Sequence, residues 1–332
     1  MKLTDILKGH LALPAFGLLL MTTACDSAIY DYEGDCSIGY KVGFVYEHNM
    51  DFTDLFPQRV RSVEVFAFDP SSHKLVWSGS ANTPALATPG FTIDMPLSPG
   101  RYDLVAWGGH LDADHFSLGA TRTAGIETID DLLCRMRRGE GATSSVDLEP
   151  LYHGMAVRVE LPDTFGTVIT RTLRMMKDTN RIHAEFSSDN GYPLDPSAFD
   201  ISISDSNGLM RYDNSLLPDE EITYLPWQTA TSPENGFTVS MTTGRLMADG
   251  KTKITVKRRS DGRSIIDLTL PPRLAESKMQ YENIMSDQEY LDRQDEYVIR
   301  FYLSGDPGYE TWNTAAGIYI NSWHVVINNS EL

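Results

Sequence analysis

Positive charge is scarce in this sequence. The 332 residues include 46 Asp and Glu but only 28 Lys and Arg, which gives a net charge of −18 at pH 7. Nucleic-acid binding requires a basic face that contacts phosphates, so nucleic acid is excluded as a partner. Anionic lipid also repels such a chain. Any attachment to a membrane must therefore come from something other than charge.

Long apolar runs are lacking beyond the first 24 residues. The one apolar run, residues 11–21, follows Lys2 and Lys8 and is succeeded by small residues. This three-part order is typical of a secretory signal peptide. The run is shorter than the roughly 20 residues that a membrane-spanning helix needs. We therefore expect residues 1–24 to be a signal peptide.

Cys25 follows this segment directly, after Thr-Thr-Ala. The arrangement resembles the lipobox of bacterial lipoproteins, in which the cysteine is acylated and becomes the new N-terminus; lipoboxes usually carry an aliphatic residue where this chain has Thr22. Two or three acyl chains, at about 0.8 kcal/mol per buried methylene, hold a protein on a membrane. We expect a lipid anchor on Cys25 and an acidic tether over residues 25–35. The alternative is a plain signal peptide followed by an unmodified cysteine.

Cysteine is also rare, with three in the whole chain. If Cys25 carries lipid, Cys36 and Cys134 remain as an even pair. Outside the cytoplasm such a pair predicts either a disulfide or two buried thiols that pack as small apolar groups. The sequence does not show whether the two lie within bonding distance, so both interpretations stay open.

Catalytic motifs are lacking as well. The sequence contains no G-x-S-x-G element, and we expect no enzyme activity. One loop after a predicted strand collects four potential metal ligands, namely His110, Asp112, Asp114 and His115. Their spacing fits no standard zinc site and lacks the Gly and bidentate Glu of a calcium loop. The loop is a weak metal candidate beside the alternative of a solvated loop, and no cofactor is expected apart from the covalent lipid on Cys25.

What the sequence does contain is alternation with a period of two. Ile38, Tyr40, Val42, Phe44 and Tyr46 share one face of a predicted half-buried strand. Further strands follow at short intervals, separated by turn signals that contain Pro and Gly. This spacing favours antiparallel β-sandwiches over a parallel sheet, which would need crossover helices. The prediction is an all-β chain of two tandem antiparallel β-sandwich domains, residues 36–155 and 156–332.

Some local predictions can be compared directly with a structure. Residues 170–177 and 182–186 are predicted to form a hairpin across the turn at Asp178. Residues 254–257 and 265–270 are predicted to form another hairpin. Short helices are expected over residues 128–138, 273–285 and 288–293, and Ser286 with Glu289 has the form of a capping box for the last of them.

Several strings, in the same order along the chain, resemble the FimB-type fimbrial anchor family of Bacteroidales. They are Asp26-Ser-Ala-Ile-Tyr-Asp-Tyr-Glu-Gly-Asp-Cys36, Pro99-Gly-Arg-Tyr-Asp-Leu-Val-Ala-Trp107, Lys177-Asp-Thr-Asn180, Tyr212-Asp-Asn-Ser-Leu216, Gln288-Glu-Tyr-Leu-Asp-Arg-Gln-Asp-Glu-Tyr297 and Ile320-Asn-Ser-Trp-His-Val-Val-Ile-Asn-Asn329. The resemblance implies two transthyretin-like sandwiches. It also implies a surface-exposed outer-membrane lipoprotein, held by its lipid, that binds a fimbrial stalk subunit at the base of a type V fimbria, ends fimbrial growth and catalyses no reaction.

The resemblance also implies how stalk subunits differ from anchors. An Arg-specific surface protease cuts the leading strand from a stalk subunit and opens a groove for a strand of another subunit. Here no arginine lies between Cys25 and Gln58, the first being Arg59, and the only lysine in that interval is Lys41. We therefore expect the first strand to stay in place.

A second hypothesis comes from a different class of protein. Trp227 and Trp312 fall in predicted loops, where aromatic rings are available to stack on sugars. With the same lipid anchor, these residues would suit a surface glycan-binding lipoprotein of a nutrient-uptake system, and they are kept as weak glycan-contact candidates.

Overall fold

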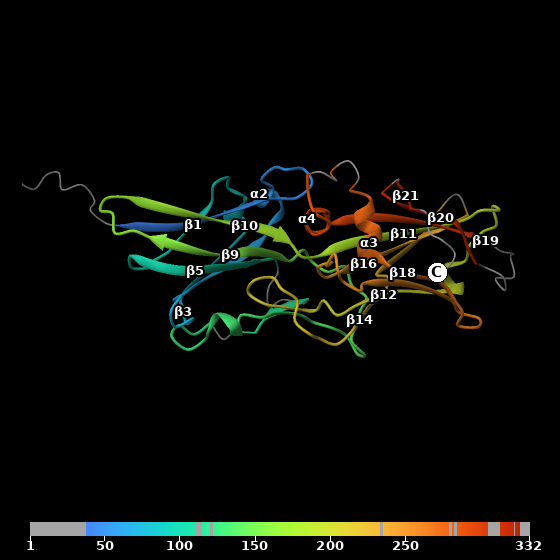
Figure 1. The fold of residues 1–332 in the computed structure, drawn as a ribbon, viewed down its shortest axis with the longest axis horizontal. Coiled ribbons are helices and arrows are strands. Elements are labelled where there is room, and N and C mark those ends of the chain that lie inside the picture. The colour runs from blue at the N-terminus through green and yellow to red at the C-terminus, as the bar shows by residue number, and fades with distance from the viewer. Residues whose placement is uncertain are drawn as a thin grey trace, which may run out of the picture.

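The computed structural model describes residues 38–109, 115–119, 122–232, 235–278, 281, 284–304, 313–321 and 323–325. Two β lobes lie end to end along the long axis (Figure 1). The expected signal peptide (residues 1–24), the tether (residues 25–35), Cys25 and Cys36 lie outside the described residues. None of the helices in the described ranges is long and apolar enough to cross a membrane.

The N-terminal lobe is built on one seven-stranded sheet. Its order is β3 (Leu75–Asn82), β2 (Ser62–Phe68), β5 (Gly100–Gly108), β9 (Tyr152–Leu161), β10 (Val168–Lys177), β1 (Gly39–His48) and β4 (Thr92–Asp94). The alternation expected for the first strand is confirmed, because Tyr40, Val42, Phe44 and Tyr46 are all buried. They pack in one hydrophobic cluster with side chains from β2, β5, β9 and β10.

The C-terminal lobe has two larger sheets. One runs β15 (Gln228–Thr231), β16 (Phe237–Thr243), β11 (Asn180–Ser188), β19 (Glu296–Ser304), β20 (Asn313–Ile320) and β21 (Trp323–Val325); the other runs β18 (Ser264–Thr269), β17 (Lys253–Arg258), β12 (Phe199–Asp205), β14 (Ile222–Tyr224) and β8 (Thr143–Ser144). The expected all-β fold with few short helices is confirmed. The hairpin predicted near residue 260 is also present, since β17 and β18 pair antiparallel.

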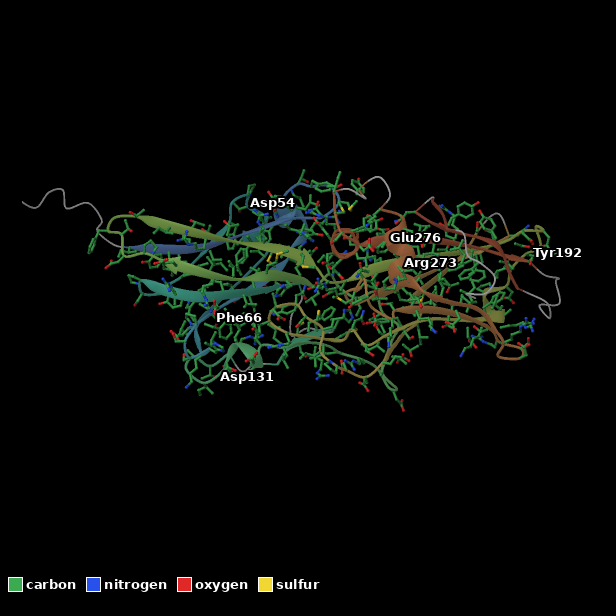
Figure 2. All side chains as sticks on the ribbon, viewed as in Figure 1. Asp54, Phe66, Asp131, Tyr192, Arg273 and Glu276 are labelled. Carbon is green, nitrogen blue, oxygen red and sulfur yellow. The ribbon has the colours of Figure 1, made fainter. Side chains whose placement is uncertain are left out.

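Strands from early in the chain join the sheets of the C-terminal lobe. A three-stranded sheet has the order β13 (Leu209–Met210), β7 (Cys134–Met136) and β6 (Phe116–Leu118), and β8 pairs with β14. Chain from before residue 150 therefore completes sheets that also contain chain from after residue 200. Phe66 lies between the seven-stranded sheet and the layer that carries Asp131 (Figure 2), and it belongs to the cluster that fills the C-terminal lobe.

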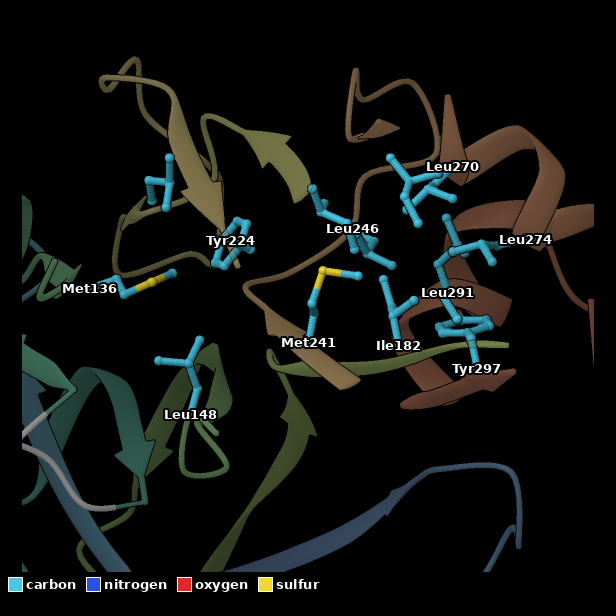
Figure 3. Close-up of a cluster of buried hydrophobic side chains, with 14 of the residues drawn as sticks. Met136, Leu148, Ile182, Tyr224, Met241, Leu246, Leu270, Leu274, Leu291 and Tyr297 are labelled. Atoms are coloured by element: carbon cyan, nitrogen blue, oxygen red, sulfur yellow. The ribbon is translucent and has the colours of Figure 1, made fainter. Parts of the chain in front are cut away.

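This shared core continues between the lobes. Met136 and Leu148, which precede residue 150, lie on the side facing Tyr224 and Met241, and the same cluster reaches Tyr297 (Figure 3). A fully buried Leu, Met or Tyr of this kind contributes about 1.5–3 kcal/mol relative to an exposed one. Burial of this common core stabilises both lobes, so the two lobes are not independent folding units.

The expected domain boundary between residues 155 and 156 falls within a strand of the N-terminal sheet, β9. Both β9 and β10 pair within the N-terminal sheet, β9 with β5 and β10 with β1. The predicted hairpin of residues 170–177 and 182–186 is wrong, because β11 pairs with β16 and β19 instead of β10. The chain passes from one lobe to the other at Asp178 and Thr179. A period of two specifies which face is buried but not which strand lies alongside.

Three strand pairs are parallel, where the sequence predicted antiparallel sheets only. They are β1 with β10, β11 with β19, and β8 with β14. Each pair joins segments that are far apart along the chain, so long intervening segments take the place of crossover helices.

The helices are few and short, as expected, but two differ in extent. The helix predicted over 128–138 is a single 3-10 turn, η2 (Ile129–Asp131), followed at once by β7. The helix predicted over 273–285 is α3 (Leu270–Glu276), with Pro at its start. The last one, α4 (Asp287–Arg293), is as expected, and the Ser286 side chain accepts a hydrogen bond from the Glu289 N–H at 3.1 Å.

Candidate functional site

The first strand, β1, is held on both of its edges. It pairs in parallel with β10 from Gly39 to His48, and in antiparallel with β4 over Lys41, Val42 and Gly43. The Lys41 Nζ lies 2.7 Å from the Asp94 Oδ1 across the β4 edge. β10 therefore covers one edge of β1 over most of its length. β4 covers the other edge over three residues, and the Met95 and Leu55 N–H groups donate to the Tyr40 and Tyr46 carbonyls on either side of them.

The inward side chains of β1 also stabilise its position in the sheet. Phe44 stacks on Phe56 of the short helix α2 (Phe56–Arg59), with ring centroids 5.3 Å apart. Tyr46 meets Tyr152 edge to face at 5.2 Å, and the Tyr40 hydroxyl donates to the Pro162 carbonyl at 2.7 Å. Removal of β1 would expose four buried side chains at a cost of about 1.5–3 kcal/mol each.

The segment after β1 is tied to the other lobe. Arg293, the last residue of α4, donates from Nη1 to the carbonyls of Glu47 and Asn49 at 3.1 and 3.2 Å. Its guanidinium also lies 4.9 Å from the centroid of the Phe52 ring. The first strand thus contacts the C-terminal lobe as well as its own.

A buried polar cluster lies where the lobes meet. Asp178 is fully buried, and the Asn214 amide donates to its Oδ1 at 2.8 Å. Arg245 makes a two-pronged ion pair with Asp292 of α4, with both distances at 2.9 Å, and donates to the Asn214 carbonyl at 2.6 Å. Burial raises the pKa of Asp178 to about 7, against the opposing effect of Arg245.

His153 borders the same cluster. It is fully buried and its Nε2 lies 2.8 Å from the Tyr212 carbonyl, so Nε2 carries the proton. Burial lowers its pKa to about 4. A cavity of about 480 Å³ runs past His153, Asn214 and Asp292. The neutral imidazole and the ionised pair around Arg245 make this junction a fixed polar contact between the lobes.

Sequence reasoning did not find this cluster, although a signal for it was present. Two of the family-like strings, Lys177-Asp-Thr-Asn180 and Tyr212-Asp-Asn-Ser-Leu216, supply Asp178 and Asn214, and a third supplies Asp292. The structure brings the three strings together at one place. Their spacing along the chain gives no hint of this, because the contact depends on how the lobes pack.

The described residues among the predicted sites lie outside the polar cluster around Asp178. Trp227 is half-buried, and its indole N–H donates to the Thr242 hydroxyl at 3.1 Å. His115 is half-buried, and its Nδ1 accepts a hydrogen bond from the Glu149 N–H at 3.4 Å. Cys134 is fully buried. The remaining candidates lie outside the described residues: Cys25, Cys36, His110, Asp112, Asp114 and Trp312.

A metal site and a disulfide therefore remain predictions only. In the part of the chain that the structure describes, no group of three or more His, Cys, Asp or Glu side chains is placed to hold a metal ion. Three of the four residues of the candidate loop lie outside the described residues.

Comparisons with known proteins agree with one another. Residues 32–329 match the family model described as fimbrillin-A associated anchor proteins Mfa1 and Mfa2. The minor fimbrium anchoring subunit Mfa2 of Porphyromonas gingivalis is 26% identical over 269 residues, 80% of each chain. Its solved fimbrial anchor protein Mfa2 superposes with a TM-score of 0.70 at 21% identity, covering 88% of this chain and 100% of that one.

A further solved structure, from Bacteroides thetaiotaomicron, is 31% identical, with a TM-score of 0.79 over 89% of this chain and 100% of that one. It was described as a candidate polysaccharide-binding protein. Another from the same organism, described as a candidate adhesin, is 29% identical with a TM-score of 0.73 and covers 87% of this chain and 98% of that one.

Proposed function

Because this chain belongs to the family of fimbrillin-A associated anchor proteins, we propose that it is a non-enzymatic lipoprotein of the outer membrane. In this proposal it holds the base of a fimbria on the cell surface and ends the growth of the polymer. Its membrane contact is the lipid on Cys25, and its protein partner is a fimbrial stalk subunit.

The observation that carries the proposal is the retention of β1. A subunit that loses its leading strand leaves a groove for the strand of the next subunit. In this chain β1 is paired on two edges, its aromatic side chains are buried, and residues 26–58 contain no arginine. An Arg-specific protease therefore has no target at or before this strand, and polymerisation through the N-terminal lobe stops here.

The test is the Cys25→Ala variant in the native host, with fimbriae measured on cells and in the medium. We expect fimbriae to be shed or to change in length. Cys36→Ala is the matched control, because it removes a cysteine near the N-terminus and keeps the lipid site. Cell-bound fimbriae of normal length in the Cys25→Ala strain would falsify the anchor function.

A glycan-binding lipoprotein is a second candidate, favoured by the description of the relative from Bacteroides thetaiotaomicron. Trp227 is half-buried, which leaves only part of its ring exposed for stacking on a sugar. Loss of polysaccharide capture in Trp227→Ala and Trp312→Ala would support this candidate. Absence of binding to any polysaccharide by the full-length chain would exclude it.

A further inference from the structure

One strand of the C-terminal lobe loses a neighbour halfway along its length. On one side β12 pairs with β17 from Phe199 to Ser204. On the other side it pairs with β14 only at Ile203, Ser204 and Asp205. Before Ile203 this edge of β12 has no strand beside it among the described residues. The Phe199 N–H donates to the Pro196 carbonyl, so the open part of the edge is at Ile201.

A proline explains the break. In the β12–β14 register the residue opposite Ile201 would be Pro226, which has no N–H to donate. The chain leaves the sheet at this point and enters the other sheet as β15, beginning with Gln228. Pro226 thus ends one pairing and starts a crossing between the two sheets.

The direction of the backbone groups follows from the alternation of an antiparallel ladder. The Arg259 N–H donates to the Ala198 carbonyl, so residues 198, 200 and 202 face β17. Ile201 must then direct its N–H and carbonyl to the opposite side, where Pro226 leaves them without a strand. Ile201 is 7% exposed, and buried backbone groups of this kind are rarely left without a partner.

The opposite wall of the gap is a second open edge. Ser232 donates to the Gly236 carbonyl, so residues 228, 230 and 232 face β16, and the backbone groups of Thr229 point away from it. All four residues of β15 are exposed and uncharged. Nothing in the composition of this edge discourages another strand from pairing with it.

A cavity of about 610 Å³ lies between these two edges. Ile201 and Thr229 both line it, and Phe199, Leu225 and Val239 supply an apolar surface. Lys257 lies at its rim, is exposed, and makes no ion pair with a carboxylate among the residues the structure describes. Asp200 and Arg259 line the same cavity and pair with each other, so with Lys257 the lining carries a net positive charge in a chain of net charge −18.

We infer that this gap, bounded by Ile201 and Thr229, is a docking slot for an extended strand of the fimbrial stalk subunit. The strand takes hydrogen bonds from the two open edges, places apolar side chains on Phe199 and Val239, and sets a carboxylate near Lys257. This inference rests on the proposed function, and it supplies the contact that a retained β1 cannot make. The slot lies in the lobe remote from the start of β1, and so away from the end that the lipid would hold (Figure 1).

The first experiment is photo-cross-linking in the native host. The cross-linking amino acid p-benzoylphenylalanine replaces Thr229 in one strain and Arg263, exposed in the turn between β17 and β18, in the control strain. We expect the first strain alone to give an adduct that contains a peptide of the stalk subunit. No adduct, an adduct with polysaccharide only, or equal adducts at both positions would overturn the slot.

The second experiment blocks the edge. Thr229→Pro removes an N–H that faces the slot and keeps every ladder bond to β16, whereas Thr229→Val keeps the N–H and the branched shape. We expect Thr229→Pro to reduce capture of the stalk subunit about tenfold, because the variant loses one edge hydrogen bond and places a proline ring in the slot. We expect Thr229→Val to leave capture unchanged. Equal melting temperatures show that both variants fold.

The two failures are distinguishable. If Cys25→Ala sheds fimbriae while Thr229→Pro leaves them attached at normal length, the slot is wrong and the anchor function stands. If Cys25→Ala leaves fimbriae on the cell, the anchor function itself is wrong, and the slot loses the partner assigned to it.

Discussion

The strands β1 and β12 have the same kind of sequence but differ in the strands that lie beside them. Each alternates apolar and polar residues, and each lies inside a sheet. β10 lies beside β1 over most of its length. On the other side β4 pairs over Lys41 to Gly43, and the Met95 and Leu55 N–H groups donate to the Tyr40 and Tyr46 carbonyls. β12, in contrast, loses its neighbour at the position opposite Pro226. β1 therefore has neighbours on both sides, whereas β12 presents an open edge at Ile201. The contrast shows that alternation makes a strand, while its neighbours decide whether it is available for binding.

The largest expected effect is at the buried polar cluster where the lobes meet. Arg245→Ala leaves Asp292 and the buried Asp178 without their cation, and removal of one partner from a buried pair costs about 3–5 kcal/mol. Urea unfolding of the purified protein measures the loss. The matched control is Arg259→Ala, whose ion pair with Asp200 is exposed at both side chains and should cost less than about 1 kcal/mol. Equal losses in the two variants would show that the junction is not a buried electrostatic contact.

A similar effect is expected inside the N-terminal lobe. Phe44→Ala removes a buried ring that stacks on Phe56, and Phe-to-Ala changes in cores cost about 3–5 kcal/mol. The same truncation at half-buried Ser202 on the wall of the slot should change the free energy of unfolding by less than about 0.5 kcal/mol. Thermal unfolding of both variants compares the buried face of β1 with the open edge of β12, and comparable destabilisation would contradict the difference between the two strands.

The pH dependence of the free energy of unfolding tests whether Asp178 is buried with a raised pKa at the junction. The pKa of Asp178 is raised in the folded state to about 7, so the folded chain binds the extra proton between about pH 4 and 7. On account of this group, the free energy of unfolding falls as the pH rises through that window. Asp178→Asn removes this fall, and its stability relative to the parent chain should increase from pH 5 to pH 8.

His153 acts in the opposite sense and serves as the control. Its pKa is lowered to about 4 in the folded state, so the unfolded chain takes up the proton first and stability falls as the pH drops from about 6.5 to 4. His153→Gln should therefore flatten the acid side of the stability curve. Denaturant titrations at each pH separate the two groups, and a parallel curve for Asp178→Asn and the parent chain would exclude a raised pKa.

The smallest effect concerns the outer edge of β1. Lys41→Ala removes an ion pair with Asp94, which is 81% exposed, and such surface pairs contribute about 0–1 kcal/mol. Unfolding in low and high salt should barely distinguish the variant from the parent chain. A loss comparable with that of Phe44→Ala would mean that the β4 edge, rather than the buried face, holds the strand.

Signals between neighbouring residues were enough to predict several elements and their buried faces. Alternation over residues 38–46 predicted the inward side chains of β1, and Ser286 with Glu289 predicted the start of α4, because both signals depend on neighbours a few residues away. The strings shared with a fimbrial anchor family, spread over the chain, predicted the family to which it belongs.

Which elements lie together became visible only in the folded chain. The tertiary structure assigned β9 and β10 to the N-terminal sheet, turned a predicted hairpin into a passage between lobes, and brought Asp178, Asn214 and Asp292 to one place. Pro226 is visible in the sequence, but its consequence requires knowing that Ile201 lies opposite. The physical reason is the same in each case: periodicity specifies a face of a strand, whereas strand partners and register depend on the packing of residues far apart in the chain.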